Sequence, residues 1–243
     1  MCQDKEDISG MLLLDKPLSL TSFKTAHKIK KTLNAKKTGH CGTLDPQATG
    51  LLLVLVDKAT KLQDKFMKKD KVYRASFELG ITTDSGDLAG NAIKKRDASG
   101  ITEKAVREAL KKFEGEISQI PPMYSALKHK GKKLYELARK GIEVERKPRK
   151  VVIKNIEFLS FSGNILDLRI ECSSGTYIRS LAHDLGAMLS CGAAVSALRR
   201  EKIGDFDVKD ALTAEYFEDA QKLKSKIIPL KNLADAFETG GNG

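Results

Sequence analysis

The stretch GHCGTLDPQATG (residues 39–50) decides how this chain is understood. It holds three glycines, a histidine, one aspartate and a proline, and it runs directly into the six apolar residues LLLVLV (51–56). Six apolar residues are too few for a buried helix and indicate a central strand. Glycine lets the backbone adopt positive φ or approach another group closely. The sequence therefore predicts that Asp45 lies in a glycine-rich turn beside a buried strand.

Two interpretations of Asp45 are open at this level. In the first, Asp45 is an N-cap, Pro46 begins a single helical turn and Gly50 ends it. In the second, Asp45 is a functional carboxylate, because a capping turn requires neither His40 nor the further glycines around it. No Gly-Lys-Ser/Thr follows, which excludes a phosphate-binding P-loop. Glycines that precede a strand also invert the order of a dinucleotide-binding fingerprint.

The composition is typical of a soluble globular protein. The chain has 243 residues, of which 41% are hydrophobic and 31% charged. No apolar run approaches the roughly 20 residues of a membrane span. The four cysteines form no Cys-x-x-Cys pair, so we expect no metal site, no disulfides and a reducing, cytoplasmic location. We also expect a monomer that requires no protein partner.

Positive charge is concentrated in one segment. Lys and Arg total 43 against 32 Asp and Glu, a net charge of +11, and residues 128–150 alone contain ten basic residues against three glutamates. Clustered positive charge is typical of phosphate binding, although a solvated basic face is the alternative. The segment also contains Tyr135 and two glycines, which favours an ordered arm over a tail.

Hydrophobic patterns predict an α+β fold with a mixed, largely antiparallel sheet flanked by helices. The expected strands are residues 11–16, 51–56, 71–80, 151–161, 164–172 and 197–206. The expected helices are residues 21–34, 102–115, 132–141 and 176–190. The first helix places Phe23, Ala26, Ile29 and Leu33 near one face, with Thr21 or Ser22 as its N-cap.

A functional Asp45 needs a group that keeps it ionised. Arg179, near the start of the helix 176–190, is a candidate, because an opposite charge favours the carboxylate form. The alternative for Arg179 is a surface helix residue. Tyr73 has a polar tip on a half-buried strand, so it is either a core aromatic with a satisfied hydroxyl or an aromatic that stacks on a base.

In these motifs the chain closely resembles the bacterial TruB family of tRNA pseudouridine synthases. Six blocks follow the family's order: DKPLSLTS, GHCGTLDPQATGLLLV, KVYRASFELGITTDSGD, QIPPMYSALKHKGKKLYELARKG, CSSGTYIRSLAHDLG and ALRR. The resemblance implies a pseudouridine synthase catalytic fold that converts uridine 55 of the tRNA T loop to pseudouridine. The N1–C1′ bond breaks, the uracil turns, and C5 joins C1′, with no cofactor and no metal. The target base is flipped out of its stack.

The resemblance also implies a role for each site residue. Asp45 is the catalytic aspartate, acting at C1′ as a nucleophile or at the 2′ position as a general base. His40 occupies the space left by the flipped base, and Tyr73 stacks on the uracil. Arg179 is expected to form the ion pair with Asp45. The further substrate-binding residues are Tyr177, Leu198 and, near the floor of the site, Lys16.

The basic segment corresponds to the family's inserted RNA-gripping arm, about residues 118–150, which holds the tRNA T-stem loop. The expected RNA-binding residues are Lys128, Lys130, Lys132, Lys133, Arg139, Arg146 and Arg149, with Asp84 and Asp87 of TTDSGD. Residues 1–243 are expected to form a single catalytic domain, with a C-terminal PUA-type RNA-binding domain absent or reduced to a stub. The alternatives are a pseudouridine synthase for another RNA and an RNA-binding tRNA chaperone.

Overall fold

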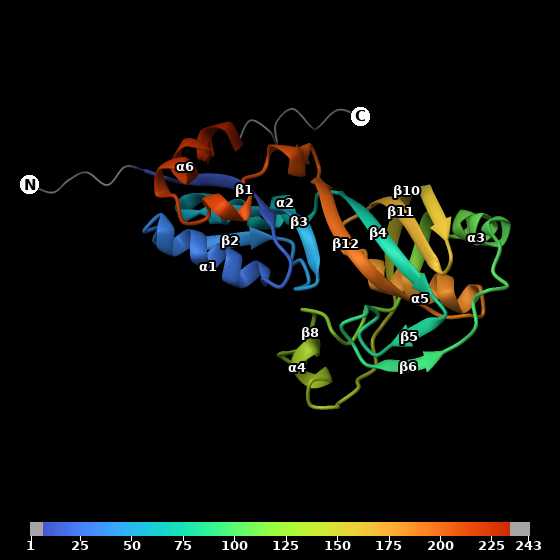
Figure 1. The fold of residues 1–243 in the computed structure, drawn as a ribbon. Coiled ribbons are helices and arrows are strands. Elements are labelled where there is room, and N and C mark those ends of the chain that lie inside the picture. Colours follow the sequence, from blue (N-terminus) through green and yellow to red (C-terminus); the bar gives the residue numbers. More distant parts are fainter. Residues whose placement is uncertain (1–6, 234–243) are drawn as a thin grey trace, which may run out of the picture. The chain divides into compact units, whose positions relative to one another are not determined.

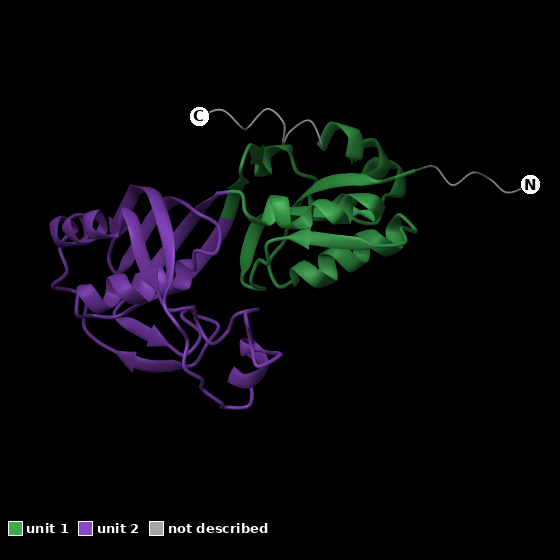
Figure 2. Cartoon of the chain, turned by 180° about the vertical axis from the view of Figure 1, so that it is seen from behind, with its two compact units in different colours: residues 1–69, 200–243 green, residues 70–199 purple. Residues whose placement is uncertain are grey.

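The computed structural model describes residues 7–233, and the chain forms two compact units (Figure 2). Unit 1 comprises residues 1–69 and 200–243, and unit 2 comprises residues 70–199. The chain leaves unit 1 after Lys69 and returns to it within the single strand β12 (Ala193–Ile203), after Arg199. The prediction that a C-terminal PUA-type domain is absent or reduced to a stub falls on residues after 233, which lie outside the described residues.

Unit 1 is a small sheet with helices against its faces (Figure 1). Its strands are β1 (Gly10–Lys16), β2 (Thr38–Cys41), β3 (Ala48–Val56), β13 (Phe206–Asp207), β14 (Ile228–Pro229) and the end of β12. Its helices are α1 (Ser22–Thr32), α2 (Gln63–Met67) and α6 (Ala220–Ser225), with 3₁₀ turns η1 (Asp57–Leu62), η3 (Val208–Asp210) and η4 (Ala214–Tyr216). The strand order is β14–β1–β3–β12, with β2 also paired to β3 and β13 to β12.

β3 is the central strand of unit 1, as its apolar run predicts. Leu52 and Val54 belong to the core that includes Ile29 of α1, whereas Leu51 and Leu53 belong to the core that includes Phe66 of α2. Both faces of β3 are therefore covered. A strand buried on both faces needs no polar residue at alternate positions, which explains the unbroken run 51–56.

Helix α1 begins where the sequence predicts, but one of the four apolar residues at helical spacing is exposed. Thr21 is the N-cap, and its side chain accepts a hydrogen bond from the backbone N–H of Lys24. Ala26 and Ile29 are buried, whereas Phe23 is 70% exposed and stacks on His27. Phe23 therefore lies outside the core, because Ser22 occupies the inward position of the first turn and bonds the backbone of Leu44.

Unit 2 contains the remaining elements. Its strands are β4 (Lys71–Leu79), β5 (Ile81–Thr83), β6 (Ala92–Lys95), β7 (Gly115–Gln119), β8 (Lys128–His129), β9 (Lys132–Lys133), β10 (Arg149–Ser162), β11 (Ile165–Cys172) and the first part of β12. Its helices are α3 (Glu103–Leu110), α4 (Leu134–Ala138) and α5 (Ile178–Met188), with the 3₁₀ turn η2 (Lys111–Phe113). The main strand order is β12–β4–β11–β10–β7.

The sheet of unit 2 is antiparallel and covered on one face by helices. β4 pairs with β11 from Lys71↔Cys172 to Glu78↔Ile165, and β11 pairs with β10 in the same sense. Inward residues such as Phe77 and Leu168 share one core with Val106 of α3 and Leu181 of α5. The predicted fold class, a largely antiparallel sheet flanked by helices, is confirmed.

The basic arm has a small core of its own within unit 2. Met123, Leu134 and Leu137 are buried together, and β8 and β9 form a two-residue ladder beside α4. Lys130 and Gly131 make the turn between these strands, both at positive φ. The apolar side chains of the segment thus fold inward, while most of its lysines and arginines remain exposed.

A substitution at Gly50 tests how tightly the strand after the Asp45 loop packs against the backbone of Arg200. The φ of Gly50 is +104°, and a Cβ there would lie 2.8 Å from the backbone nitrogen of Arg200 and closer still to its carbonyl oxygen. Gly50→Ala should lower the free energy of unfolding by about 2 kcal/mol or more, through backbone strain and this clash. Urea unfolding measures the loss.

Gly100→Ala is the matched control, since a Cβ at Gly100 meets no atom within 4 Å. Its effect should stay within about 0.5 kcal/mol. Equal stabilities for the two variants would show that the packing between Gly50 and Arg200 is loose.

Candidate active site

The loop that carries Asp45 connects two paired strands of unit 1. His40 and Cys41 of β2 lie opposite Val54 and Leu53 of β3. The backbone N–H of Ala48 donates to the carbonyl of Asp45 at 3.0 Å, so Asp45 opens a tight turn. No helix begins there, and Gly50 lies within β3. The capping interpretation of Asp45 was therefore wrong, because the chain enters a strand directly after the turn.

The DKPLSLTS segment holds the outer side of this loop. The Ser22 hydroxyl accepts from the backbone N–H of Leu44 at 2.8 Å and lies 3.1 Å from its carbonyl. The backbone N–H of Ser19 donates to the carbonyl of Pro46 at 2.8 Å. These bonds fix the backbone on both sides of Asp45.

A buried arginine that the sequence analysis did not single out holds the inner side. Arg200 is 1% exposed; its Nε donates to the carbonyl of Leu51 at 2.8 Å and a terminal nitrogen donates to that of Gly42 at 3.0 Å. One guanidinium thus joins the two ends of the loop. Arg200 is the second arginine of ALRR, and because Arg199, Glu201 and Lys202 beside it are also charged, the local sequence does not single it out.

Lys16 is the second buried cation of this unit. Its ammonium donates to the carbonyls of Pro17 at 2.9 Å and Leu20 at 2.7 Å. Burial lowers the pKa of Lys16 to about 8, while the charge of Asp45 opposes that shift and the charge of Arg200 adds to it. Lys16, Arg200 and Asp45 therefore form one electrostatic group. Positive neighbours of this kind favour the ionised carboxylate.

His40 has a lowered pKa and one buried ring nitrogen without a hydrogen-bond partner among the described residues. Burial, and secondarily the charge of Arg200, lower the pKa of His40. Its Nδ1 is buried and has no hydrogen-bond partner within residues 7–233. The carbonyl of His40 accepts from the side-chain amide of Gln63 at 3.1 Å, which fixes the backbone beneath the ring.

In unit 2, Arg179 is buried at the start of α5, so the surface alternative for it was wrong. It is 5% exposed, and its terminal nitrogens donate to the carbonyls of Ser85 and Tyr124, both at 2.7 Å. Its Nε lies 3.9 Å from a carboxylate oxygen of Asp87. Asp45 belongs to unit 1 and Arg179 to unit 2, and the ion pair between them stays a prediction.

The two aspartates of TTDSGD order the loop around Arg179. Asp87 accepts from the Ser85 hydroxyl at 2.7 Å and from the backbone N–H of Ala89 at 3.1 Å. Asp84 accepts from the backbone and side chain of Asn91, at 2.9 and 3.1 Å. Both carboxylates thus have structural partners, and their contact with RNA stays a prediction.

The remaining expected pocket residues lie around the same unit 2 core. Tyr73 of β4 and Leu198 of β12 are half-buried and pack against it. Tyr177 precedes α5, and its backbone exchanges two hydrogen bonds with the side chain of the buried Gln119. Gln119 therefore positions Tyr177, a role that the sequence analysis did not assign.

The basic residues of the arm have different environments. Lys128, Lys130, Lys132 and Lys133 belong to β8, β9 and the turn between them, Arg139 follows α4, and Arg149 opens β10. Lys133 and Arg139 lie 5.5 and 5.4 Å from the ring centre of Tyr135. Arg146 differs, since it bonds Glu143 at 2.8 Å and lines a cavity of about 710 Å³ that Arg179 also lines.

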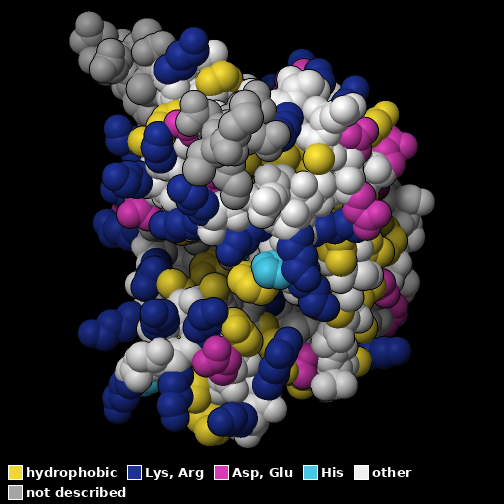
Figure 3. All heavy atoms as spheres, turned by 90° about the vertical axis from the view of Figure 1, so that its left-hand side faces the viewer, with side chains coloured by type: hydrophobic (Ala, Val, Ile, Leu, Met, Phe, Trp, Pro, Cys, Tyr) yellow, Lys and Arg dark blue, Asp and Glu magenta, His cyan; other side chains and the backbone are white. Residues whose placement is uncertain are grey.

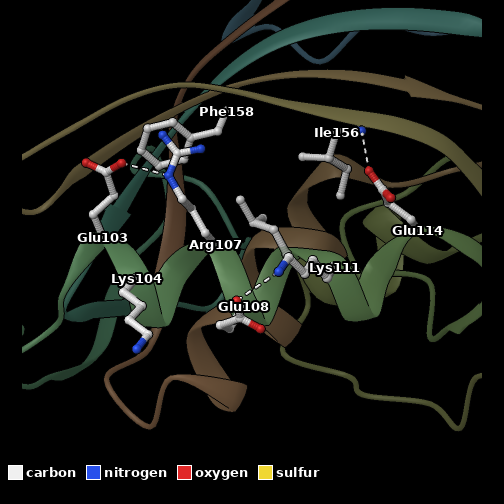
Figure 4. A pocket seen from close by; sticks show the side chains of 9 residues that line it. Glu103, Lys104, Arg107, Glu108, Lys111, Glu114, Ile156 and Phe158 are labelled. Atoms are coloured by element: carbon white, nitrogen blue, oxygen red, sulfur yellow. Dashed lines mark hydrogen bonds and ion pairs between the residues drawn. The ribbon is translucent and has the colours of Figure 1, made fainter.

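A second pocket of unit 2 carries none of the expected site residues. It measures about 460 Å³ and lies between α3 and β10 (Figure 4). Four of its charged residues form two ion pairs: Arg107 bonds Glu103 at 2.7 Å and covers the ring of Phe158, and Lys111 bonds Glu108 at 2.8 Å. This arrangement stabilises the helix surface.

Two family models together match most of the chain. Residues 30–178 match "TruB family pseudouridylate synthase (N terminal domain)", and residues 179–236 match "tRNA pseudouridylate synthase B C-terminal domain". The tRNA pseudouridine synthase B of Endomicrobium trichonymphae is 63% identical over 230 residues, which cover 95% of this chain and 100% of that protein. The protein of the same name from Bordetella avium (strain 197N) is 48% identical over 230 residues, 94% of each chain.

Solved structures support the fold. A chain of a Cbf5–Nop10–Gar1 complex matches with a TM-score of 0.71 and 32% identity, over 93% of this chain and 61% of that one. A chain of an archaeal box H/ACA Nop10–Cbf5 complex matches with a TM-score of 0.69 and 26% identity, over 96% of this chain and 68% of that one. This chain thus spans about three fifths of the first of them.

Arg200→Met should loosen the Asp45 loop. The change leaves the carbonyls of Gly42 and Leu51 without their donor, and an unpaired buried polar group costs about 1–3 kcal/mol. Amide hydrogen exchange across residues 42–51 should therefore accelerate about tenfold or more. Lys202→Met on the same strand removes only a half-exposed ion pair with Asp207 and should leave the exchange of these amides unchanged. Equal protection in both variants would contradict the role of Arg200.

Lys16 should leave a signature in the pH dependence of stability. Its folded-state pKa of about 8 lies below the ordinary 10.5, so the unfolded chain binds more protons between these values. The cost of burying the charge is present below pH 8 and is lost as the pH rises toward 10.5. Relative to Lys16→Met, wild-type stability should increase over this window in urea unfolding. The exposed-site control Lys209→Met should follow the wild type, and a flat difference between wild type and Lys16→Met would contradict the shift.

Proposed function

The chain belongs to the TruB family of pseudouridylate synthases, and we propose that it converts uridine 55 in the T loop of tRNA to pseudouridine. The observation that carries the proposal is the fixed Asp45 turn, held from outside by Ser19 and Ser22 and from inside by Arg200. A carboxylate on a rigid turn, next to two buried cations, is preorganised to react with a base that has left its stack.

The reaction exchanges one bond of the substrate for another. The N1–C1′ bond breaks, the uracil turns, the C5–C1′ bond forms, C5 loses a proton and N1 gains one. Asp45 acts either as a nucleophile at C1′ or as a general base at the 2′ position, and both roles require the ionised form. The positive charge of Lys16 interacts with Asp45, and an opposite charge nearby favours the carboxylate form.

The other site residues are proposed to hold the flipped nucleotide. His40 takes the space that the base leaves. Tyr73 stacks on the uracil, while Tyr177 and Leu198 line the pocket around it. Stacking on an aromatic ring is a common way to hold an extruded base.

Arg179 is proposed as the ion-pair partner of Asp45 in the working enzyme. Two of its nitrogens are bound to the carbonyls of Ser85 and Tyr124, so its guanidinium has a fixed orientation. Asp84 and Asp87 frame the same loop toward the RNA. A planar, preorganised arginine pairs with a carboxylate at a smaller entropic cost than a lysine does.

The arm, about residues 118–150, is proposed to hold the T stem through phosphate contacts. Lys128, Lys130 and Lys132 are exposed on its hairpin, and Lys133 and Arg139 lie 5.5 and 5.4 Å from the ring centre of Tyr135. Recognition by shape and phosphates suits a structured RNA stem. The two units together are proposed to act as one catalytic domain.

We further propose a monomer that works in the cytoplasm without cofactor, metal or protein partner. The reaction is an isomerisation, so it consumes neither an oxidant nor a second substrate. Within residues 7–233, every helix is too short or too polar to cross a membrane.

Asp45→Asn tests the proposal, because the amide keeps the shape of the turn and removes the charge. Incubation with an unmodified tRNA transcript should give a single pseudouridine in the T loop with the wild type and none with the variant. Carbodiimide treatment followed by primer extension locates the modified base. Asp205→Asn, on an exposed turn of unit 1, is the matched control and should retain full activity.

Three results would oppose the proposal. Pseudouridine at another position would indicate a different RNA target, and undiminished product from Asp45→Asn would remove Asp45 from the chemistry. Binding of tRNA without any product in the wild type would favour the chaperone alternative.

A further inference from the structure

A second concave surface of unit 1 is lined by lysines and lies apart from the Asp45 loop. It measures about 620 Å³. The lysine hollow, as we name it, is defined by Lys36, Lys37, Lys58, Lys61 and Lys224. They come from three separate segments: the end of the α1–β2 connection, η1 and α6. Lysines and arginines far outnumber acidic side chains over the face in Figure 3.

The negative charges of the hollow are already engaged. Asp7 bonds the ammonium of Lys58 at 2.7 Å. Asp57 accepts from the backbone N–H of Lys37 at 2.9 Å, and the side chain of Lys37 is exposed. Within residues 7–233, no carboxylate pairs with Lys36, Lys37 or Lys61. Like charges gathered in a hollow repel each other unless an anion joins them.

The lining also restricts what the hollow can recognise. Besides the lysines and two aspartates it contains Ile8, Ser9, Leu33, Asn34 and Thr60, and no aromatic side chain. Without an aromatic ring there is no platform on which a base can stack. Ammonium groups are point charges that suit phosphates irrespective of the base sequence. The hollow is therefore suited to a backbone and not to bases.

The distance between Asp45 and the lysine hollow indicates which part of an RNA reaches the hollow. β3 joins the two places: the Asp45 turn precedes Ala48, and Asp57 follows Val56 directly. At about 3.3 Å per residue, this strand separates them by roughly 30 Å. That length corresponds to about ten base pairs of duplex. A substrate held at Asp45 would need a continuous stem of this order to fill the hollow.

We propose that the lysine hollow binds the phosphate backbone of the tRNA substrate at a part outside the T-stem loop. The identity of the polyanion rests on the proposed function. The hollow then adds affinity and orientation for the full tRNA, while the chemistry at the target uridine depends on the Asp45 site alone.

The triple variant Lys36→Ala/Lys37→Ala/Lys61→Ala tests this assignment. All three side chains are exposed, so the fold should persist. Affinity for an unmodified full-length tRNA transcript should fall about tenfold or more at low salt, and the slope of log K against log salt should decrease by about 3. Fluorescence anisotropy over a series of salt concentrations measures both.

Two comparisons make the test specific. Lys68→Ala/Lys209→Ala/Lys231→Ala removes the same charge from exposed positions outside the hollow and should change the slope little. A hairpin that contains only the T stem and loop should bind and react equally well with the wild type and the hollow variant. A nonspecific charge effect would instead weaken both RNAs with both triple variants.

The outcomes separate this proposal from the proposed function. A wild type that forms no pseudouridine in either RNA contradicts the proposed function, while the binding comparison still reports on the hollow. An unchanged salt slope for full-length tRNA overturns the hollow as a phosphate site, as does an equal loss of affinity for the hairpin.

Discussion

The hydrogen bonds from the guanidinium of Arg200 to the carbonyls of Gly42 and Leu51 are the constraint on which the candidate site depends. They join the two ends of the loop that carries Asp45, and Gly50 allows the backbone of Arg200 to lie against the same strand. A buried arginine is costly unless its donors are satisfied. The carbonyls of this loop meet that requirement, so the loop and the arginine hold each other in place.

Unit 2 uses the same device at Arg179. Its guanidinium binds the carbonyls of Ser85 and Tyr124, residues far apart in the sequence, and lies near the carboxylate of Asp87. Each unit therefore has one buried arginine that joins loops through their backbone oxygens. Planar guanidinium groups with several donors are suited to this role, and lysine is not. Asp45 lies on the segment that Arg200 holds, and Asp84 and Asp87 lie beside Ser85 on the loop that Arg179 holds.

Charge has two separate uses in the molecule. Inside unit 1, the charge of Lys16 interacts with both Asp45 and Arg200, while burial and, secondarily, the charge of Arg200 lower the pKa of His40. On the surface, the arm presents exposed ammonium groups around a small apolar core. The lysine hollow presents them around a concave surface. Buried charge sets protonation states, whereas exposed charge attracts a polyanion and is screened by salt.

The sequence by itself determined the main secondary-structure elements and the types of side chain that the site contains. The run 51–56 predicted the central strand, alternation in 71–80 predicted β4, and the motif order indicated the family, because these signals are local or cumulative along the chain. Only the tertiary structure decided that Phe23 faces solvent and that Asp45 caps no helix. It also decided that Arg200 holds the Asp45 loop, that Gln119 holds Tyr177, and that the lysine hollow forms from separate segments. Those features depend on contacts between segments that are distant in the sequence, and no local sequence pattern encodes such contacts.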